Sequence, residues 1–246
     1  MVDFQRLVYL KTTKSTNDYA INLSNSDPNH NTCTYTFDQI AGRGQIGRYW
    51  FSDTDKNLTT TFSWKQPDIP IQEQFRINMA FSLALWDFAA SIIPDKEHLM
   101  IKWPNDIYFK DKKLAGILIQ NVLKGTAIEV CHLGVGINVN QLVFPESLPN
   151  PISFRQICAH NFDLEDLQKK LIQKVSSGLG RLSDHNFELK SAYESLLFRK
   201  EMVATYQVGD QKLAGIIKGT SPEGKLRIDL EDGMREFNFR EVGYVL

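Results

Sequence analysis

The fold of this chain is decided by residues 131–140, CHLGVGINVN. Their odd positions are apolar, namely Cys131, Leu133, Val135, Ile137 and Val139. Their even positions are polar residues or glycines, namely His132, Gly134, Gly136, Asn138 and Asn140. Successive side chains of a strand point to opposite faces, so the segment predicts a strand with one packed face and one cleared face. Glycines weaken a strand, which favours a ligand or another backbone in close approach; close packing against a neighbouring helix is the alternative.

Strand-like segments surround this one and predict a mostly antiparallel sheet. Ranges 99–103, 107–109 and 114–122 alternate with short turns before the strand at 127–139. Residues 72–93 contain neither glycine nor proline and predict a helix buried across the sheet. Further strands are expected at 7–12, 32–37 and 58–64, with a short capped helix at 19–23. The expected fold class is therefore α+β, a mixed, mostly antiparallel sheet backed by helices.

The sequence changes in character toward the C-terminus. Residues 144–151 contain three prolines and predict a loop, and residues 164–198 predict one or two amphipathic helices. From Val203, short alternating runs separated by glycine turns predict a small β-barrel of about forty-five residues. We therefore expect two domains, residues 1–200 and residues 201–246.

Composition excludes several classes of protein. The 246 residues are 42% hydrophobic and carry a formal net charge of -1, which argues against a protein-wide attraction to nucleic acid or to an anionic membrane. The three cysteines share no paired spacing, so neither a disulfide framework nor a zinc site is expected. The N-terminus lacks an apolar leader, and the most apolar stretch, 79–93, is too short to span a bilayer. A cytoplasmic location is predicted.

Residues 39–50, QIAGRGQIGRYW, form a glycine-rich cationic loop between two predicted strands. The loop matches G-x-G-x-x-G, but no helix follows and the lysine of a phosphate-binding P-loop is missing, so we reject both nucleotide fingerprints. Arg43 and Arg48 could instead close over a polyanion. A plain hairpin with solvated arginines is the alternative.

Residues 102–106, KWPND, and Lys113 form the third candidate group. The Trp-Pro step fixes a turn that aims Asn105 and Asp106 in the same general direction, which suits Mg²⁺ held partly through water and phosphate oxygens. An Asx-type turn and a solvated hairpin lysine are the alternatives. Cys131 and His132 point to opposite faces and form no dyad, and the five histidines are scattered.

Five segments, in this order, resemble the motifs of the biotin-protein ligases: residues 15–17, 39–48, 102–106, 113–118 and 134–138. The resemblance covers about residues 7–140, and the C-terminal part is similar to the SH3-like domain of that family. It implies a catalytic domain of the biotin/lipoate ligase fold, similar to class II synthetases, at residues 1–200, and an SH3-like β-barrel at residues 201–246.

The resemblance also implies an activity. Such a ligase joins biotin to ATP as biotinyl-5′-AMP, with Mg²⁺ as the accompanying ion, and transfers biotin to a lysine of a biotin carboxyl carrier protein, as in acetyl-CoA carboxylase. No tightly bound prosthetic group is implied. The catalytic-type sequence begins almost at Met1, so we expect a ligase that binds neither DNA nor a membrane; we also consider a homodimer.

Site roles follow from the resemblance, residue by residue. Lys113 and Arg43 are the implied catalytic residues, and Asp106 the implied Mg²⁺ partner. The implied biotin contacts are Ser15, Thr16, Asn17, Gln39, Gly42, Arg43, Lys113, Gly116, Leu118 and Gly134. The implied ATP and adenylate contacts are Arg43, Arg48, Trp50, Asn105 and Asn138. Gln45 departs from the arginine of some family members, which puts retention of the adenylate in doubt.

Two rival interpretations stay open. A lipoate-protein ligase would share the fold and the adenylation chemistry, but Ser15, Thr16 and Gln39 are more polar than an apolar dithiolane ring requires. A non-catalytic sensor of biotinyl-adenylate is the other rival, and the retained Lys113, Asp106 and both loop arginines argue against it.

Overall fold

The computed structural model describes residues 1–26, 30–45, 47–65, 67 and 69–245. Its larger sheet has seven strands in the order β1-β2-β5-β9-β8-β7-β6. The bounds in that order are Arg6–Tyr9, Thr32–Thr36, Asn57–Lys65, Ala127–Asn138, Lys112–Lys124, Asp106–Phe109 and Leu99–Lys102. β1 and β2 are parallel, and the five other pairs are antiparallel. The expected mixed, mostly antiparallel sheet is confirmed.

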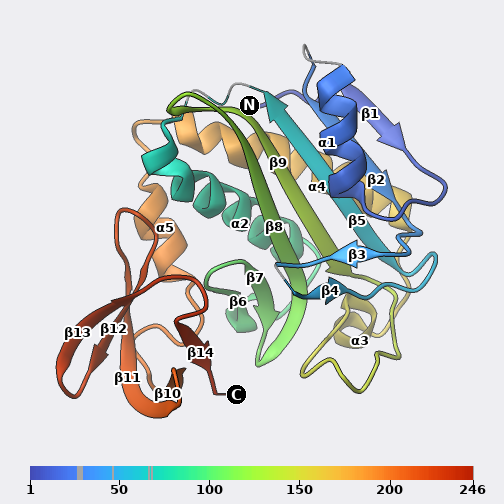
Figure 1. The fold of residues 1–246 in the computed structure, drawn as a ribbon. Helices are drawn as coiled ribbons and strands as arrows, with labels where there is room; N and C mark the ends of the chain where they lie inside the picture. Colours follow the sequence, from blue (N-terminus) through green and yellow to red (C-terminus); the bar gives the residue numbers. More distant parts are fainter. Residues whose placement is uncertain (27–29, 46, 66, 68, 246) are drawn as a thin grey trace.

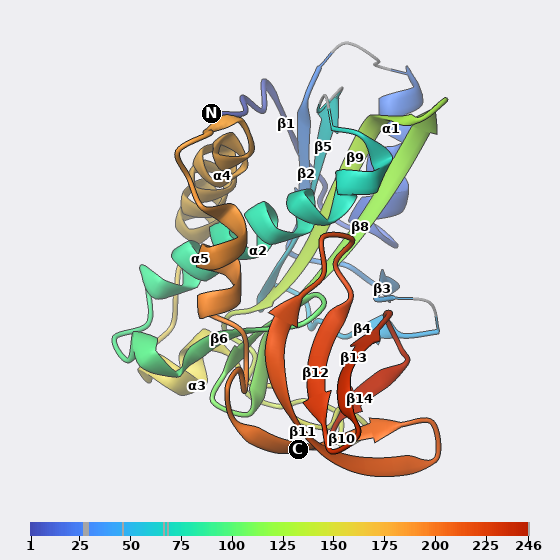
Figure 2. The ribbon, with the colours of Figure 1, turned by 90° about the vertical axis from the view of Figure 1, so that its left-hand side faces the viewer.

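Helices cover both faces of this sheet. α2 (Gln74–Ala90), α4 (Leu164–Leu179) and α5 (Leu189–Ser195) lie on one face, and α1 (Thr16–Ser26) lies on the other (Figures 1 and 2). A short α3 (Phe154–Cys158) follows the loop after β9, as Figure 1 also shows. The prediction of a buried central helix is confirmed by α2, whose Phe81 ring meets the Phe62 ring of β5 edge-on at 6.1 Å.

The two faces of β9 differ as the alternation predicts. The odd positions, from Cys131 to Val139, belong to the hydrophobic core. The even face lies toward α1, and it is covered. His132 is fully buried, and a Cβ on Gly134 would lie 2.2 Å from Asn17 Oδ1 of α1. At Gly134, therefore, the close packing against a helix that we considered as the alternative does occur.

A second sheet follows α5 and contains five strands in the order β13-β12-β11-β10-β14. Their bounds, in sequence order, are Val203–Val208, Gln211–Thr220, Leu226–Leu230, Gly233–Phe237 and Val242–Tyr244 for β10 to β14. All neighbouring pairs are antiparallel. A C-terminal β-sheet unit is confirmed, while a domain boundary at residue 200 stays a prediction.

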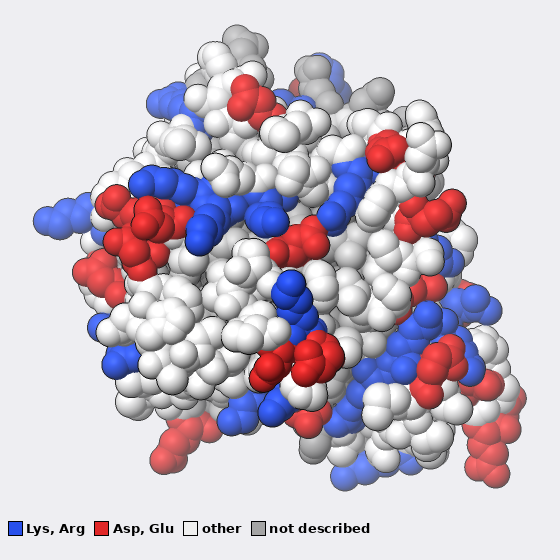
Figure 3. Space-filling view, turned by 180° about the vertical axis from the view of Figure 1, so that it is seen from behind, with Lys and Arg blue, Asp and Glu red and all other residues white. Residues whose placement is uncertain are grey.

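The cationic loop contains a small hairpin, in which β3 (Gly42–Arg43) pairs with β4 (Tyr49–Trp50). The hairpin lies across the face of the larger sheet, in front of β8 and β9 (Figure 1), and its Trp50 packs on Gly116 and Gly136 of these strands. On the opposite side of the molecule, basic and acidic side chains are both distributed over the surface (Figure 3). That distribution fits a formal net charge of -1 and leaves cationic chemistry to local sites.

Within the described residues, none of the helices combines the length and the apolar character that crossing a membrane would require.

Candidate active site

A cavity of about 90 Å³ lies between the start of α1, the hairpin β3–β4 and strands β8 and β9. The structure brings thirteen of the predicted site residues to its wall. They are Ser15, Thr16, Asn17, Gln39, Arg43, Arg48, Trp50, Asn105, Asp106, Lys113, Gly116, Leu118 and Gly134. These residues come from segments up to 119 positions apart, from 15 to 134, so the fold assembles them into one site.

Polar side chains form a hydrogen-bonded cluster at one end of the cavity. Gln39 Oε1 accepts from the backbone N–H of Thr16 at 2.8 Å and from Thr16 Oγ1 at 3.2 Å. Thr61 Oγ1 lies 3.0 Å from Thr16 Oγ1 and 2.5 Å from Asn17 Oδ1. All four residues are buried. Buried polar groups that are paired in this way are held in one orientation, which suits recognition of a polar ring.

The same cluster fixes the start of α1. Ser15 Oγ accepts from the Asp18 N–H at 3.3 Å, as an N-cap side chain does. Asn17 Nδ2 donates to Gln120 Oε1 at 2.9 Å and approaches the Leu118 carbonyl at 3.4 Å, which ties α1 to β8. The first turn of α1 therefore presents its side chains to the cavity in a fixed arrangement.

Lys113 and Asp106 form an ion pair at the other end of the cavity, with Lys113 Nζ 2.7 Å from Asp106 Oδ1. The backbone of Lys113 is held on both sides. Its N–H donates to the Asn150 carbonyl at 2.7 Å, and its carbonyl accepts from the Ile152 N–H at 2.9 Å. The ammonium group is thus both paired and positioned. Little side-chain freedom would be lost when it contacts an anion.

Trp50 occupies the space above the glycines. A Cβ on Gly136 would lie 2.3 Å from Trp50 Cε2, and a Cβ on Gly116 would lie 3.1 Å from Trp50 Cζ3. The buried Trp50 Nε1 has no hydrogen-bond partner among the described residues. The cleared positions of β8 and β9 therefore admit an indole ring, whose unpartnered N–H lies close to Gly136.

The two loop arginines differ in their surroundings. Arg43 forms an exposed ion pair with Asp18 of α1, at 3.1 Å. Arg48 lies at the cavity wall and near Lys102. The pKa of Lys102 is lowered to about 8, mainly by burial; Asp106 opposes the shift, and Lys113 and Arg48 add to it. Cations therefore gather around one carboxylate, which is the arrangement that neutralises an anionic ligand.

A larger cleft of about 960 Å³ adjoins the cavity and shares Arg43 and Arg48 with it. Its other walls are the start of α2, residues 104–105, residues 117–121 of β8, and two turns of the C-terminal sheet, at 223–225 and 238–240. The C-terminal sheet therefore contributes directly to the surroundings of the site.

Gly42 and Asn138 are the two predicted site residues that do not line the cavity. Gly42 packs beneath it, where a Cβ would lie 2.5 Å from the Trp50 carbonyl oxygen. Asn138 Nδ2 donates to the carbonyls of Ile152, at 3.0 Å, and Lys113, at 3.3 Å. Asn138 therefore helps to hold the backbone of Lys113 in place. Its assignment as an adenine contact stays a prediction.

Two contributions escape a reading of motifs. Thr61 completes the polar cluster, although β5 carries hydroxyl side chains on both faces and its alternation does not single this residue out. Tyr49, to which no role was assigned, also lines the cavity. Among the described residues, no group of three or more His, Cys, Asp or Glu side chains could hold a metal ion by itself.

Comparison with known proteins gives consistent relationships. Residues 9–139 match the sequence model of the family described as Biotin/lipoate A/B protein ligase. The bifunctional ligase/repressor BirA of Escherichia coli is 27% identical over 237 residues, which cover 95% of this chain and 72% of that protein. The biotin–[acetyl-CoA-carboxylase] ligase of Mycobacterium tuberculosis is 29% identical over 196 residues, covering 78% of this chain and 71% of that one.

A solved structure extends the likeness to both sheets. The biotin protein ligase from Aquifex aeolicus in complex with biotin and ATP matches with a TM-score of 0.80 and 25% sequence identity. The match covers 98% of this chain and 100% of that protein.

Proposed function

Because this chain belongs to the biotin/lipoate A/B protein ligase family, we propose that it is a biotin–[biotin carboxyl-carrier protein] ligase. It activates biotin with ATP and transfers the biotinyl group to a lysine of a carrier domain. The observation that carries the proposal is a single cavity lined both by the Lys113–Asp106 ion pair and by the buried, hydrogen-bonded pair of Thr16 and Gln39. Thr61 is bonded to Thr16 next to the cavity.

The first half-reaction brings two anions together. A carboxylate oxygen of biotin attacks the α-phosphorus of ATP, the bond from that phosphorus to the bridging oxygen breaks, and pyrophosphate leaves with the electron pair. Fixed positive groups must offset the repulsion between carboxylate and phosphate. We assign that role to Lys113, between the two anions, and to Arg43 and Arg48, which approach the phosphates from the loop.

In the second half-reaction the neutral amine of the carrier lysine attacks the carbonyl carbon of the mixed anhydride. AMP leaves, and the amine loses a proton as the amide forms. The mixed anhydride hydrolyses if water reaches it, so a hairpin that covers it protects the intermediate as well as binding it.

MgATP is the nucleotide substrate in this proposal. Mg²⁺ in nucleotide sites is commonly held by one or two carboxylates together with phosphate oxygens and water. Asp106 and the amide of Asn105, which both line the cavity, fit that pattern. Within the described residues, no group of three or more His, Cys, Asp or Glu side chains could hold the ion without the nucleotide.

Trp50 must move for the ligands to enter. The cavity of about 90 Å³ is well below the roughly 300 Å³ at the lower end of small-molecule pockets. Displacing the indole from Gly136 would enlarge it. We propose that Trp50 then lies beside the adenine, where its N–H finds a partner.

Polar Ser15, Thr16 and Gln39 favour the ureido ring of biotin over the dithiolane ring of lipoate. Three free thiols, two of them buried, support a reducing cytoplasm as the place of action. The proposed partner is the carrier domain of acetyl-CoA carboxylase or a related enzyme.

The test is incubation of the protein with radiolabelled biotin, MgATP and a purified carrier domain, with radiolabelled lipoate in a parallel reaction. Biotin label in the carrier supports a ligase. Tightly held adenylate without transfer identifies a sensor. Label in the carrier from lipoate alone identifies a lipoate-protein ligase.

A further inference from the structure

The turn between β11 and β12, residues 221–225, packs on the turn that carries Asp106. Trp103 is 2% exposed, and its Nε1 donates to the carbonyl oxygen of Gly224 at 2.9 Å. The Trp103 ring also meets the ring of Phe239, from the same sheet, at 5.2 Å and 65°. One side chain of residues 102–106 is therefore enclosed by two turns of the C-terminal sheet.

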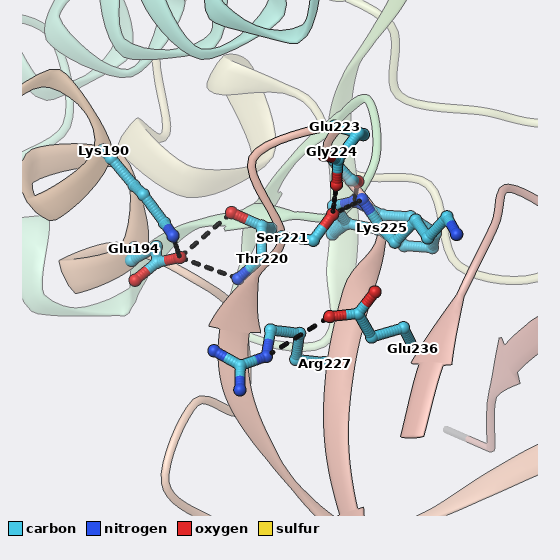
Figure 4. Close-up of polar contacts among 10 residues, drawn as sticks. Lys190, Glu194, Thr220, Ser221, Glu223, Gly224, Lys225, Arg227 and Glu236 are labelled. Carbon is cyan, nitrogen blue, oxygen red and sulfur yellow. Dashed lines mark hydrogen bonds and ion pairs between the residues drawn. The ribbon is translucent and has the colours of Figure 1, made fainter. Parts of the chain in front are cut away.

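The 221–225 turn is itself held rigidly, as Figure 4 shows for its polar contacts. Ser221 Oγ donates to Glu223 Oε2 at 2.9 Å and accepts from the Lys225 N–H at 3.2 Å. At its start, Glu194 Oε1 of α5 accepts from the N–H of Thr220 at 2.7 Å and from its hydroxyl at 3.0 Å. The turn is thus fixed to the helical layer at its base.

Gly224 allows this turn to pack closely against α2. Its φ is +90°, and a Cβ there would lie 2.3 Å from Cγ of Phe75 in α2. No side chain fits between the turn and α2, so the turn can press against Phe75 and still place its carbonyl over Trp103.

From Trp103 the contacts lead directly to the ion pair. Asn78 Nδ2 of α2 donates to the Pro104 carbonyl at 2.8 Å. Asn105 exchanges two bonds with Ile117 of β8, since its carbonyl accepts from the Ile117 N–H at 2.8 Å and its Nδ2 donates to the Ile117 carbonyl at 2.6 Å. Asp106 follows, paired with Lys113 at 2.7 Å.

We propose that Trp103 is a positioning residue through which the C-terminal sheet holds Asp106 and Lys113 in register for adenylate formation. The part of the inference that concerns the reaction rests on the proposed function. The mechanical part of the inference is independent of the proposed function. It states that the 221–225 turn stabilises the Asn105–Ile117 contact through Trp103. Trp103 does not line the cavity of the candidate site, so its loss should lower the rate of the chemical step more than the affinity for biotin.

The first test compares Trp103→Phe with Trp86→Phe. Trp86 offers a matched control, because its Nε1 donates to a backbone carbonyl, that of Leu99, at 2.8 Å and makes no bond to the C-terminal sheet. Both variants lose one indole hydrogen bond and keep an aromatic ring. Hydrogen exchange, measured by mass spectrometry on the ligand-free proteins, should be at least ten-fold faster at the Ile117 amide in Trp103→Phe and unchanged in Trp86→Phe.

The second readout is biotin-dependent ATP–pyrophosphate exchange. We expect kcat to fall at least ten-fold in Trp103→Phe, with KM for biotin within two-fold of the wild-type value, and both parameters to be retained in Trp86→Phe. Equal behaviour of the two variants in hydrogen exchange or in kcat overturns the inference. Absence of pyrophosphate exchange in the wild-type protein would refute the proposed function instead, and hydrogen exchange at Ile117 would still decide the mechanical part.

A second pair of variants covers the case in which Trp103→Phe fails to fold. Gly224→Ala pushes the turn away from Phe75, whereas Gly233→Ala introduces a methyl group at φ +115° with no atom within 4 Å. Both strain the backbone of the same sheet, but only Gly224→Ala should accelerate exchange at Ile117 and lower kcat. Equal effects of the two alanines would count against Trp103 as the link.

Discussion

Replacement of Lys113 by methionine gives the most direct test of the chemistry, since it keeps the unbranched apolar stem and removes the charge. The side chains of Lys113 and Asp106 are 30% and 13% exposed, so the change leaves a largely buried carboxylate without its partner. Exposed pairs contribute about 0–1 kcal/mol, and breaking a buried pair costs about 3–5 kcal/mol. For this intermediate case we expect a loss of about 2 kcal/mol, equivalent to a fall in Tm of about 4–8 °C for a chain of this size.

The effect on rate should be much larger than the effect on stability. Removing one preorganised donor to a developing charge costs roughly 2.7–4 kcal/mol of transition-state stabilisation, a factor of about 10²–10³ in kcat. A domain stable by about 5–15 kcal/mol stays folded after losing about 2 kcal/mol, so inactivity would not reflect unfolding.

The assay is biotin-dependent release of pyrophosphate, with circular dichroism and thermal melts on the same samples. Lys112→Met is the matched control, because Lys112 is exposed and points away from its neighbour along β8. It should keep both rate and fold. Normal pyrophosphate release by Lys113→Met would remove Lys113 from the mechanism.

Other predictions address the polar cluster, the buried histidine and the indole. Gly134→Ala should weaken biotin binding at least ten-fold in calorimetry, because its methyl group displaces Asn17, whereas Gly243→Ala, whose nearest contact is an ordinary 3.5 Å, should not. Burial, reinforced by Lys65, lowers the pKa of His132 to about 4 from 6.5, so the unfolded chain takes up a proton first as the pH falls. Stability should therefore drop by up to about 3 kcal/mol between pH 6.5 and pH 4, and His132→Gln should flatten this dependence in urea titrations; an equal slope in both proteins would contradict the assignment. Biotin with MgATP should change the tryptophan emission of the wild-type protein, and a change of equal size in Trp50→Phe would show that Trp50 does not move.

Much of the fold could be predicted because its signals are local. The strands from Leu99 to Asn138 alternate in character and are separated by turn residues, and α2 lacks helix breakers, so both appear within a few residues of their expected bounds. The short α3 escaped prediction although it has a signal, the capping box of Ser153 and Gln156. Only five residues follow that cap, too few for a periodic pattern.

The candidate site was less accessible to sequence reasoning, because its contacts join distant segments. The residues of five motifs do meet at one cavity. The glycines of β9, however, could not reveal that an indole and an asparagine would occupy the space above them. The bond from Trp103 to Gly224 spans 121 residues, and no local pattern encodes it.

The contact between Trp50 and Gly136 constrains how this chain can diverge. The largest side chain and the smallest share one volume, with no room for even a methyl group between them. As sequences drift, a bulkier residue at position 136 should become acceptable only after position 50 has shrunk, so the order of substitutions matters. Libraries that randomise the two positions together should therefore recover active pairs that single-site scanning would miss.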